Sequence, residues 1–181
     1  MRDCYIKNPN KVGVYIGTIS NISTSKYYID NVTVRGTEDI LLENTAAFKI
    51  NGSDHHFVDC TVSNIPIGFS INGGACRFYR CHDWNAKDAL IDNTIGFQIN
   101  AGGCTFVDCY LDTLKIGFDI NASAQFLLCD GFNNSQYGMT NEIYYKKNSP
   151  STKVKIIGGE IRNNQGTIIT DTTNVTFIAF N

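Results

Sequence analysis

Short runs of alternating apolar and polar residues cover most of the chain. In "GFSIN", residues 68–72, Phe69 and Ile71 alternate with polar residues, and the same pattern returns at 96–100 and 117–121. A period of two predicts β-strands, and no apolar stripe at helical spacing is sustained. In "FVDCTV", residues 57–62, the alternation breaks once, between Phe57 and Cys60. We therefore expect a bend there, so that two short strands direct their apolar side chains into one interior.

A longer phrase containing this pattern occurs three times. It reads "IGFSINGGACRFYRC" at 67–81, "IGFQINAGGCTFVDC" at 95–109 and, one residue shorter, "IGFDINASAQFLLC" at 116–129. Successive equivalent phenylalanines, at 48, 69, 97 and 118, are 21, 28 and 21 residues apart. A unit of about twenty residues is typical of a solenoid. We predict an all-β fold, a right-handed parallel β-helix of about seven coils of about 21 residues.

The predicted β-helix domain covers residues 12–181, and residues 1–11 are expected to be a lead-in or linker. We expect the domain to be part of a longer chain. The segment from Asn141 to Lys155 interrupts the rhythm, and it could pack against a neighbouring chain or cover the stack.

Equivalent residues of successive coils should stack in columns. The inward columns are Phe48, Phe69, Phe97 and Phe118; Ile50, Ile71, Ile99 and Ile120; and Cys60, Cys81, Cys109 and Cys129. Asn51, Asn72, Asn100 and Asn121 form a further column at a turn, where their amides can hydrogen-bond from coil to coil. This repetition is what a continuous solenoid core requires.

The cysteines are expected to be free thiols. Cys76 and Cys104 form a second thiol column, with His55 and Ala124 in the equivalent places. In-register stacking leaves Cβ atoms about 4.8 Å apart, beyond the roughly 3.8 Å that a disulfide prefers. The chain has 7 cysteines and no CxxC spacing, so we expect neither a disulfide framework nor a metal site, and folding in a reducing compartment.

Charge and hydropathy exclude two classes of partner. The formal net charge is −2 with a pI near 5.9, so no basic field gathers the phosphates of nucleic acid. No apolar run approaches the roughly 20 residues of a membrane span. The sequence also carries no motif that leads us to expect a cofactor.

Departures from the repeat are the places where function is expected on a solenoid. Two similar longer loops occur, "GTEDILLENT" at 36–45 and "NAKDALIDNT" at 85–94. Asp39 matches Asp88 and Glu43 matches Asp92, and these carboxylates would lie about 10 Å apart on one edge. Inverting glycosidases hold two carboxyl groups at roughly 6.5–9.5 Å, so the four are candidate catalytic residues. They could equally cap and solubilise two turns, or bridge a cation.

Outward positions supply the remaining candidates. Lys49, Ser70, Gln98 and Asp119 form the outward row of the first strand, a polar row that could contact a sugar chain or could equally just face water. Asp119 is a fifth candidate catalytic carboxylate. Gln98, together with the aromatic residues Tyr79, Trp84 and Tyr110 near outward turns, is predicted to bind substrate, because aromatic faces on a polar groove commonly hold sugars.

The coil pattern "IGFxIN…FVDCTVSN" resembles the parallel β-helices of the pectate-lyase-like superfamily across residues 12–181, most of all those of bacteriophage tailspikes and tail appendages. The resemblance implies a homotrimer that binds or cuts the surface polysaccharide of a bacterial host. It also implies a place in the virion tail after folding in the host cytoplasm, with the bacterial surface or secretion as the alternative. The polygalacturonase motifs NTD, DD, SHG and RIK are absent.

Three functions are therefore open. The first is a noncatalytic domain that recognises a glycan, the second is a polysaccharide hydrolase or lyase, and the third is a structural spacer of a trimeric spike.

The enzyme hypothesis makes a direct prediction. If the loop carboxylates are catalytic, Asp88→Asn alone should abolish depolymerisation, because its amide can neither donate nor accept the catalytic proton. Polymer size is measured after separate incubations with the wild type and with the variant. Unchanged turnover in the variant would refute the assignment.

Overall fold

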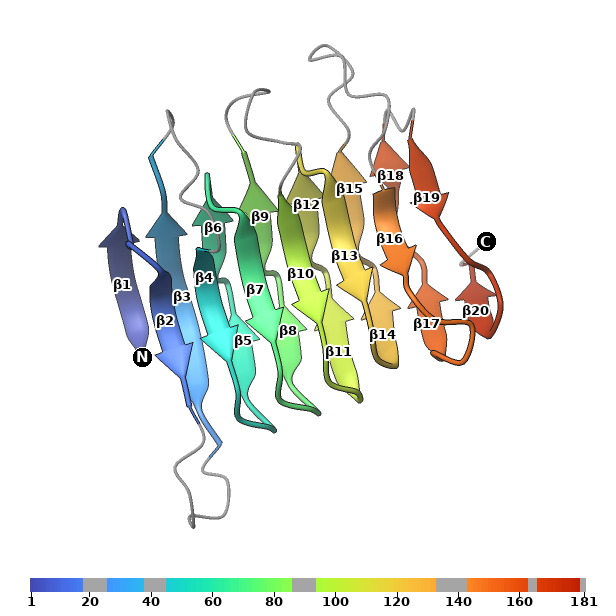
Figure 1. Ribbon diagram of the computed structural model, residues 1–181, viewed down its shortest axis with the longest axis horizontal. Coiled ribbons are helices and arrows are strands. Elements are labelled where there is room, and N and C mark those ends of the chain that lie inside the picture. Colours follow the sequence, from blue (N-terminus) through green and yellow to red (C-terminus); the bar gives the residue numbers. More distant parts are fainter. Residues whose placement is uncertain (18–25, 38–44, 86–93, 133–142, 163–165, 180–181) are drawn as a thin grey trace.

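The computed structural model describes residues 1–17, 26–37, 45–85, 94–132, 143–162 and 166–179. Within these ranges all regular secondary structure is β-strand, and every strand pairing is parallel. The strands form two sheets that face each other along an elongated body, with β1 at one end and β20 at the other (Figure 1). The all-β prediction is confirmed, and the arrangement is consistent with a parallel β-helix.

One sheet has seven strands in sequence order, each contributed by one repeat. They are β2 (Val12–Ile16), β4 (Ala46–Ile50), β7 (Ile67–Ile71), β10 (Ile95–Ile99), β13 (Ile116–Ile120), β16 (Ile143–Lys147) and β19 (Thr167–Ile169). The segment 141–155 therefore contributes a regular strand, β16, which pairs with β13 and β19.

The other sheet has thirteen strands in two branches that meet at the long strand β3 (Tyr28–Arg35). The first branch contains β5 (His56–Val58), β8 (Arg77–Tyr79), β11 (Cys104–Val107), β14 (Ala124–Leu127), β17 (Val154–Ile157) and β20 (Val175–Ile178). The second branch contains β6 (Thr61–Ser63), β9 (His82–Trp84), β12 (Tyr110–Asp112), β15 (Asp130–Phe132) and β18 (Ile161–Arg162). The expected lead-in contains β1 (Arg2–Lys7), which pairs with β3.

A left-handed residue produces the bend between the two branches. Asp59, which separates β5 from β6, has φ 50°, and Asn31, in the same place within β3, also has φ 50°. Positive φ recurs at seven equivalent positions: Asp3, Asn31, Asp59, Arg80, Asp108, Leu128 and Gly158. One αL residue reverses the alternation of side chains, so the residues before and after it both point inward. The bend predicted between Phe57 and Cys60 is confirmed.

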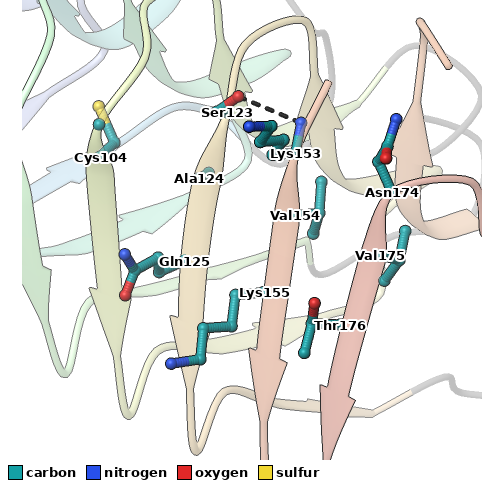
Figure 2. Close-up of a pocket in the computed structure, with 11 residues that line it drawn as sticks. Cys104, Ser123, Ala124, Gln125, Lys153, Val154, Lys155, Asn174, Val175 and Thr176 are labelled. Carbon is teal, nitrogen blue, oxygen red and sulfur yellow. Dashed lines mark hydrogen bonds between the residues drawn. The ribbon is translucent and has the colours of Figure 1, made fainter. Parts of the chain in front are cut away.

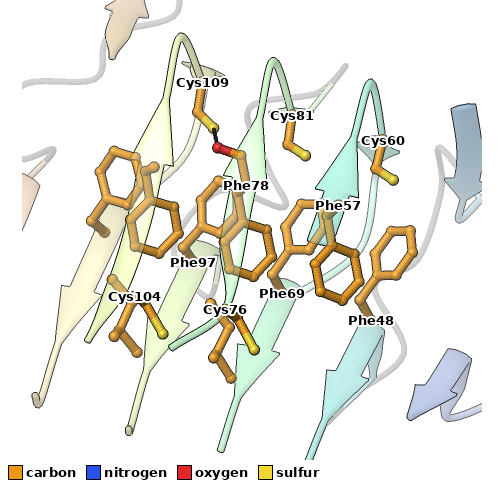
Figure 3. Close-up of a cluster of buried hydrophobic side chains, with 14 of the residues drawn as sticks. Phe48, Phe57, Cys60, Phe69, Cys76, Phe78, Cys81, Phe97, Cys104 and Cys109 are labelled. Carbon is orange, nitrogen blue, oxygen red and sulfur yellow. Dashed lines mark hydrogen bonds between the residues drawn. The ribbon is translucent and has the colours of Figure 1, made fainter. Parts of the chain in front are cut away.

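Two stacks of aromatic rings fill the interior (Figure 3). In the predicted column, Phe48, Phe69 and Phe97 stack with centroids 4.7 and 4.4 Å apart, and all are fully buried. A parallel stack on the first branch contains Phe57, Phe78, Phe106 and Phe126. Rings of the two stacks meet edge to face, for instance Phe69 and Phe78 at 5.6 Å. Each such pair adds about 0.5–1.5 kcal/mol beyond the burial of its area.

Two rows of thiols line the interior beside the rings (Figure 3). All seven cysteines are free, and six of them are buried. Their Sγ atoms contact backbone carbonyls, as Cys109 does with Phe78 O at 3.6 Å. Burial raises the pKa of the Cys81 and Cys109 thiols well above the usual range, so these groups stay protonated. The prediction of free thiols that pack as small apolar groups is confirmed.

The asparagine column forms a continuous ladder on the surface. Each side-chain amide donates to the amide oxygen one strand earlier: Asn72 to Asn51 at 3.1 Å, Asn100 to Asn72 at 2.9 Å, Asn121 to Asn100 at 2.9 Å and Asn148 to Asn121 at 2.7 Å. The predicted coil-to-coil hydrogen bonds are confirmed, and the ladder extends one strand further than predicted.

A buried ion pair ends the isoleucine column. Lys147 pairs in register with Ile120, and its side chain is fully buried. Its Nζ lies 2.8 Å from Asp171 Oδ2, and this hydrogen bond lowers the pKa of Asp171 to about 2. Within the described ranges no helix is long and apolar enough to cross a membrane.

The ladder predicts a measurable loss of stability on truncation. Asn100→Ala removes two amide hydrogen bonds at the exposed turn, and we expect the free energy of unfolding to fall by about 1 kcal/mol. Denaturant unfolding measures this. Thr105→Ala, on the neighbouring strand β11 and outside the ladder, is the control, and an equal loss in both variants would contradict a stabilising ladder.

Candidate functional site

The two longer loops connect equivalent strands of the repeat. One joins β3 to β4 and the other joins β9 to β10, so each leaves the second branch and enters the seven-stranded sheet. The same junction takes residues 64–66 between β6 and β7 and residues 113–115 between β12 and β13, whereas between β15 and β16 it takes residues 133–142. Asp39, Glu43, Asp88 and Asp92 lie outside the described residues, whereas the flanking residues Thr37, Thr45, Asn85 and Thr94 lie within them.

The four predicted substrate-binding residues lie on three different surfaces. Tyr79 is on β8 of the first branch, where its ring lies 6.3 Å from that of His56. Gln98 is on β10 of the seven-stranded sheet, where it accepts a hydrogen bond from Ser70 Oγ at 3.3 Å. Trp84 and Tyr110 are on β9 and β12, adjacent strands of the second branch. Only this pair shares a surface.

Trp84 and Tyr110 each have a partner on that surface. The guanidinium of Arg35 lies 6.0 Å from the centre of the Trp84 ring, at the range of a cation–π contact. Ser63 stands between Arg35 and Trp84 in register and is buried, so its small side chain leaves room for this contact. The Tyr110 ring meets His82 edge to face, with centroids 4.9 Å apart. We call Arg35, Trp84, His82, Tyr110 and Asp112 the aromatic face.

The electrostatics of the aromatic face suit neutral groups. Burial lowers the pKa of His82, so its imidazole is neutral at pH 7. Asp112 is opposite Trp84 in register, and burial raises the pKa of its carboxyl, an effect that the hydrogen bond from Thr113 Oγ1 opposes. Of the five residues of the aromatic face, only Arg35 is therefore positively charged at pH 7.

Asp119, the fifth candidate carboxylate, is already paired. Its side chain is only 9% exposed, and Oδ1 accepts from Asn148 Nδ2 at 2.8 Å and lies 3.5 Å from Lys146 Nζ. Asn121 Nδ2 lies 3.5 Å from Oδ2. These contacts tie Asp119 to the asparagine ladder, so its carboxylate supports the sheet surface.

Asp83, between the two outward residues His82 and Trp84, points inward. It stands in register between Val62 and Leu111, is fully buried, and neither carboxyl oxygen has a hydrogen-bond partner. Burial raises its pKa well above the usual range, which the nearby Trp84 backbone N–H only partly offsets. A perturbed carboxyl is often functional. This one is sealed in the core, so we assign it a structural role.

Sequence reasoning missed Arg35, His82 and Asp112. The signal was present, because a period of two places His82 on the same side as Trp84, and Asp112 on the same side as Tyr110. In the described part of the chain no group of three or more His, Cys, Asp or Glu side chains is arranged to hold a metal ion.

Comparisons of the chain with protein-family models, with curated proteins and with solved structures each gave no match. The class of protein is therefore defined by the fold alone, as an all-β protein of parallel strands.

Asp83 predicts an unusual dependence of stability on pH. Folding raises the pKa of Asp83. Below the unfolded pKa near 3.8 the carboxyl is protonated in both states, so burial costs no ionisation energy there. As pH rises towards the folded pKa, only the unfolded state ionises, and stability is lost. Asp83→Asn cannot ionise, so its buried amide has a cost that does not vary with pH. The unfolding equilibrium of the wild type, relative to the variant, should shift by up to tenfold per pH unit above about pH 4.

Urea unfolding between pH 4 and pH 8 measures that difference. Asp108→Asn changes an exposed carboxylate at the bend and serves as the control. Parallel pH curves for the wild type and Asp83→Asn would contradict a buried, protonated Asp83.

Proposed function

We propose that the chain is a right-handed parallel β-helix of about seven coils, one for each strand of the seven-stranded sheet. We further propose that it is a noncatalytic domain of a phage tail or tailspike-type protein and binds the surface polysaccharide of a bacterial host. The parallel strands support the first proposal, because each repeat adds one strand to the seven-stranded sheet and one to each of the two branches. The aromatic face supports the second.

The observation that carries the binding proposal is the pairing of Trp84 with Arg35 beside Tyr110 with His82. Sugar rings present apolar C–H faces and hydroxyl edges, which match partly exposed aromatic rings next to polar groups, such as Trp84 and Tyr110. The carboxyl of Asp112 and the guanidinium of Arg35 can bond hydroxyls at the rim. Thr37 and Asn85, the last described residues before the two longer loops, follow strands of this face, and loops that border a binding surface commonly carry specificity.

The location and assembly follow from the same proposal. Buried thiols in two columns suit folding in a reducing host cytoplasm before assembly into a virion tail. Partly exposed apolar side chains in one row of the first branch support a homotrimer: Val58, Val107, Leu127 and Ile157.

Polysaccharide cleavage is the second candidate function. Asp112 favours it, because a carboxyl with a raised pKa beside an aromatic ring is the usual general acid of a glycosidase. The second carboxylate would come from Asp39, Glu43, Asp88 or Asp92. A structural spacer remains the third function, and in it no surface would bind glycan.

Binding through the aromatic face predicts a specific loss on truncation. Trp84→Ala removes the ring that Arg35 contacts, and we expect affinity for the bound glycan to fall at least about fivefold, as for a central aromatic contact. The measurement is retention of capsular, O-antigen and teichoic-acid polymers on the immobilised protein. Tyr79→Ala, on the first branch, should bind as the wild type does.

Polymer length is followed in the same incubation, and the melting temperature of each variant controls for folding. Shortened chains would establish the enzyme in place of the noncatalytic domain. No retention of any polymer, or equal losses in Trp84→Ala and Tyr79→Ala, would refute the aromatic face as the binding site.

A further inference from the structure

A step in the surface lies beside the asparagine ladder. The turn between each ladder asparagine and the inward residue that follows it varies in length. It has three residues after Asn72 and after Asn100, two after Asn121 and five after Asn148. A short turn therefore lies next to a long one, which contains residues 149–153. A hollow of about 350 Å³ occupies this place, across β14, β17 and β20 (Figure 2). That volume is within the range of ligand sites.

The walls of the hollow are polar and its floor consists of small residues. Lys153, Lys155, Gln125, Asn174 and Thr176 supply side chains that can bond a ligand, and no acidic residue lines it. Ala124 and Val154 are buried beneath them. Small floor residues and the short turn keep the space open.

The wall is held in place by its own hydrogen bonds. The Lys153 backbone N–H donates to Ser123 Oγ at 3.1 Å, which ties the long turn to the short one (Figure 2). Asn174 Nδ2 donates to Pro150 O at 2.9 Å, so the far side of the turn is fixed as well. A preformed site loses less conformational entropy when it binds.

The hollow is a local positive region on a chain whose net charge is −2. Within the described ranges neither Lys153 nor Lys155 forms an ion pair, whereas Lys146 and Lys147 are both paired with aspartates. Lys155 extends over the strand that carries Gln125 (Figure 2). Arg77 stands in the same row, beyond Thr105 and Gln125.

We propose that this hollow binds an anionic substituent, a carboxylate or a phosphate, of a polysaccharide. The two ammonium groups supply the charge, and Gln125, Asn174 and Thr176 supply hydrogen bonds to the oxygens and to neighbouring hydroxyls. This inference rests on the proposed glycan binding and deepens it, since it names the charged class of polymer and a second contact site. A nucleic acid would offer phosphate too, but the net negative charge of the chain opposes its approach.

The test uses polymers that share a backbone and differ in charge. The probes are dextran, carboxymethyl dextran and dextran phosphate, with a DNA oligonucleotide as a further arm. The wild type should bind a charged dextran at least about tenfold more tightly than dextran, and added salt should weaken this binding. Comparison of the two charged polymers decides between carboxylate and phosphate.

The variant Lys153→Gln/Lys155→Gln should lower affinity for the charged dextran about tenfold, since each exposed ion pair contributes modestly. Lys49→Gln, on the exposed side of β4, removes a lysine elsewhere and should leave affinity unchanged. Lys155→Arg keeps the charge and should retain binding. Melting temperatures control for folding.

The proposal is overturned if the wild type binds dextran as well as its charged forms, if Lys49→Gln loses as much affinity as the double variant, or if DNA is bound more tightly than either charged dextran. These results leave the aromatic face untouched, because the Trp84→Ala comparison is made with native polymers and does not depend on the two lysines.

Discussion

The in-register stacking of parallel strands is the constraint on which the rest of this structure depends. Every side chain has an equivalent neighbour one strand away, at about 4.8 Å. A residue type can therefore fill a column only if its side chain packs against, or hydrogen-bonds to, an identical side chain on the next strand. Phenylalanine rings stack, thiols pack, and asparagine amides donate and accept in turn. Like charges cannot do this, and the outer rows place opposite charges together, as with Asp59 and Arg80 at 2.7 Å.

The same constraint explains why the exceptions are compensated. Asp83 enters an apolar column, and the position facing it is Gly68, where an added Cβ would lie 2.0 Å from Asp83 Oδ2. The missing side chain gives the carboxyl its space. Lys147 enters the isoleucine column, and Asp171 neutralises it at the point where the column ends. In both places the cost of a buried polar group is reduced locally and the register is unchanged.

Much of the core could be predicted from sequence, because in-register stacking repeats the same residue types at a regular spacing. The columns that begin at Phe48, Ile50 and Cys60, the ladder that begins at Asn51, and the bend after Phe57 all follow from spacing and period alone. The candidate site could be predicted only in part. Sequence separates inward from outward residues, but an outward residue can lie on any of three surfaces. Tyr79, Trp84 and Gln98 were thus grouped together, although the bend and the turns direct them apart.

Variation in this fold is therefore confined to the outer rows and the corners. The aromatic face and the hollow beside Lys153 both arise there. The aromatic face forms where Ser63 leaves room for Arg35 to reach Trp84. The hollow forms where a short turn adjoins a long one. They lie on different branches, with the left-handed row that includes Asp108 and Leu128 between them. A polymer that contacted both would have to cross this row, where Leu128 is 49% exposed and offers an apolar surface to a sugar ring. The bend between the two branches would then also set the angle at which such a polymer crosses the protein.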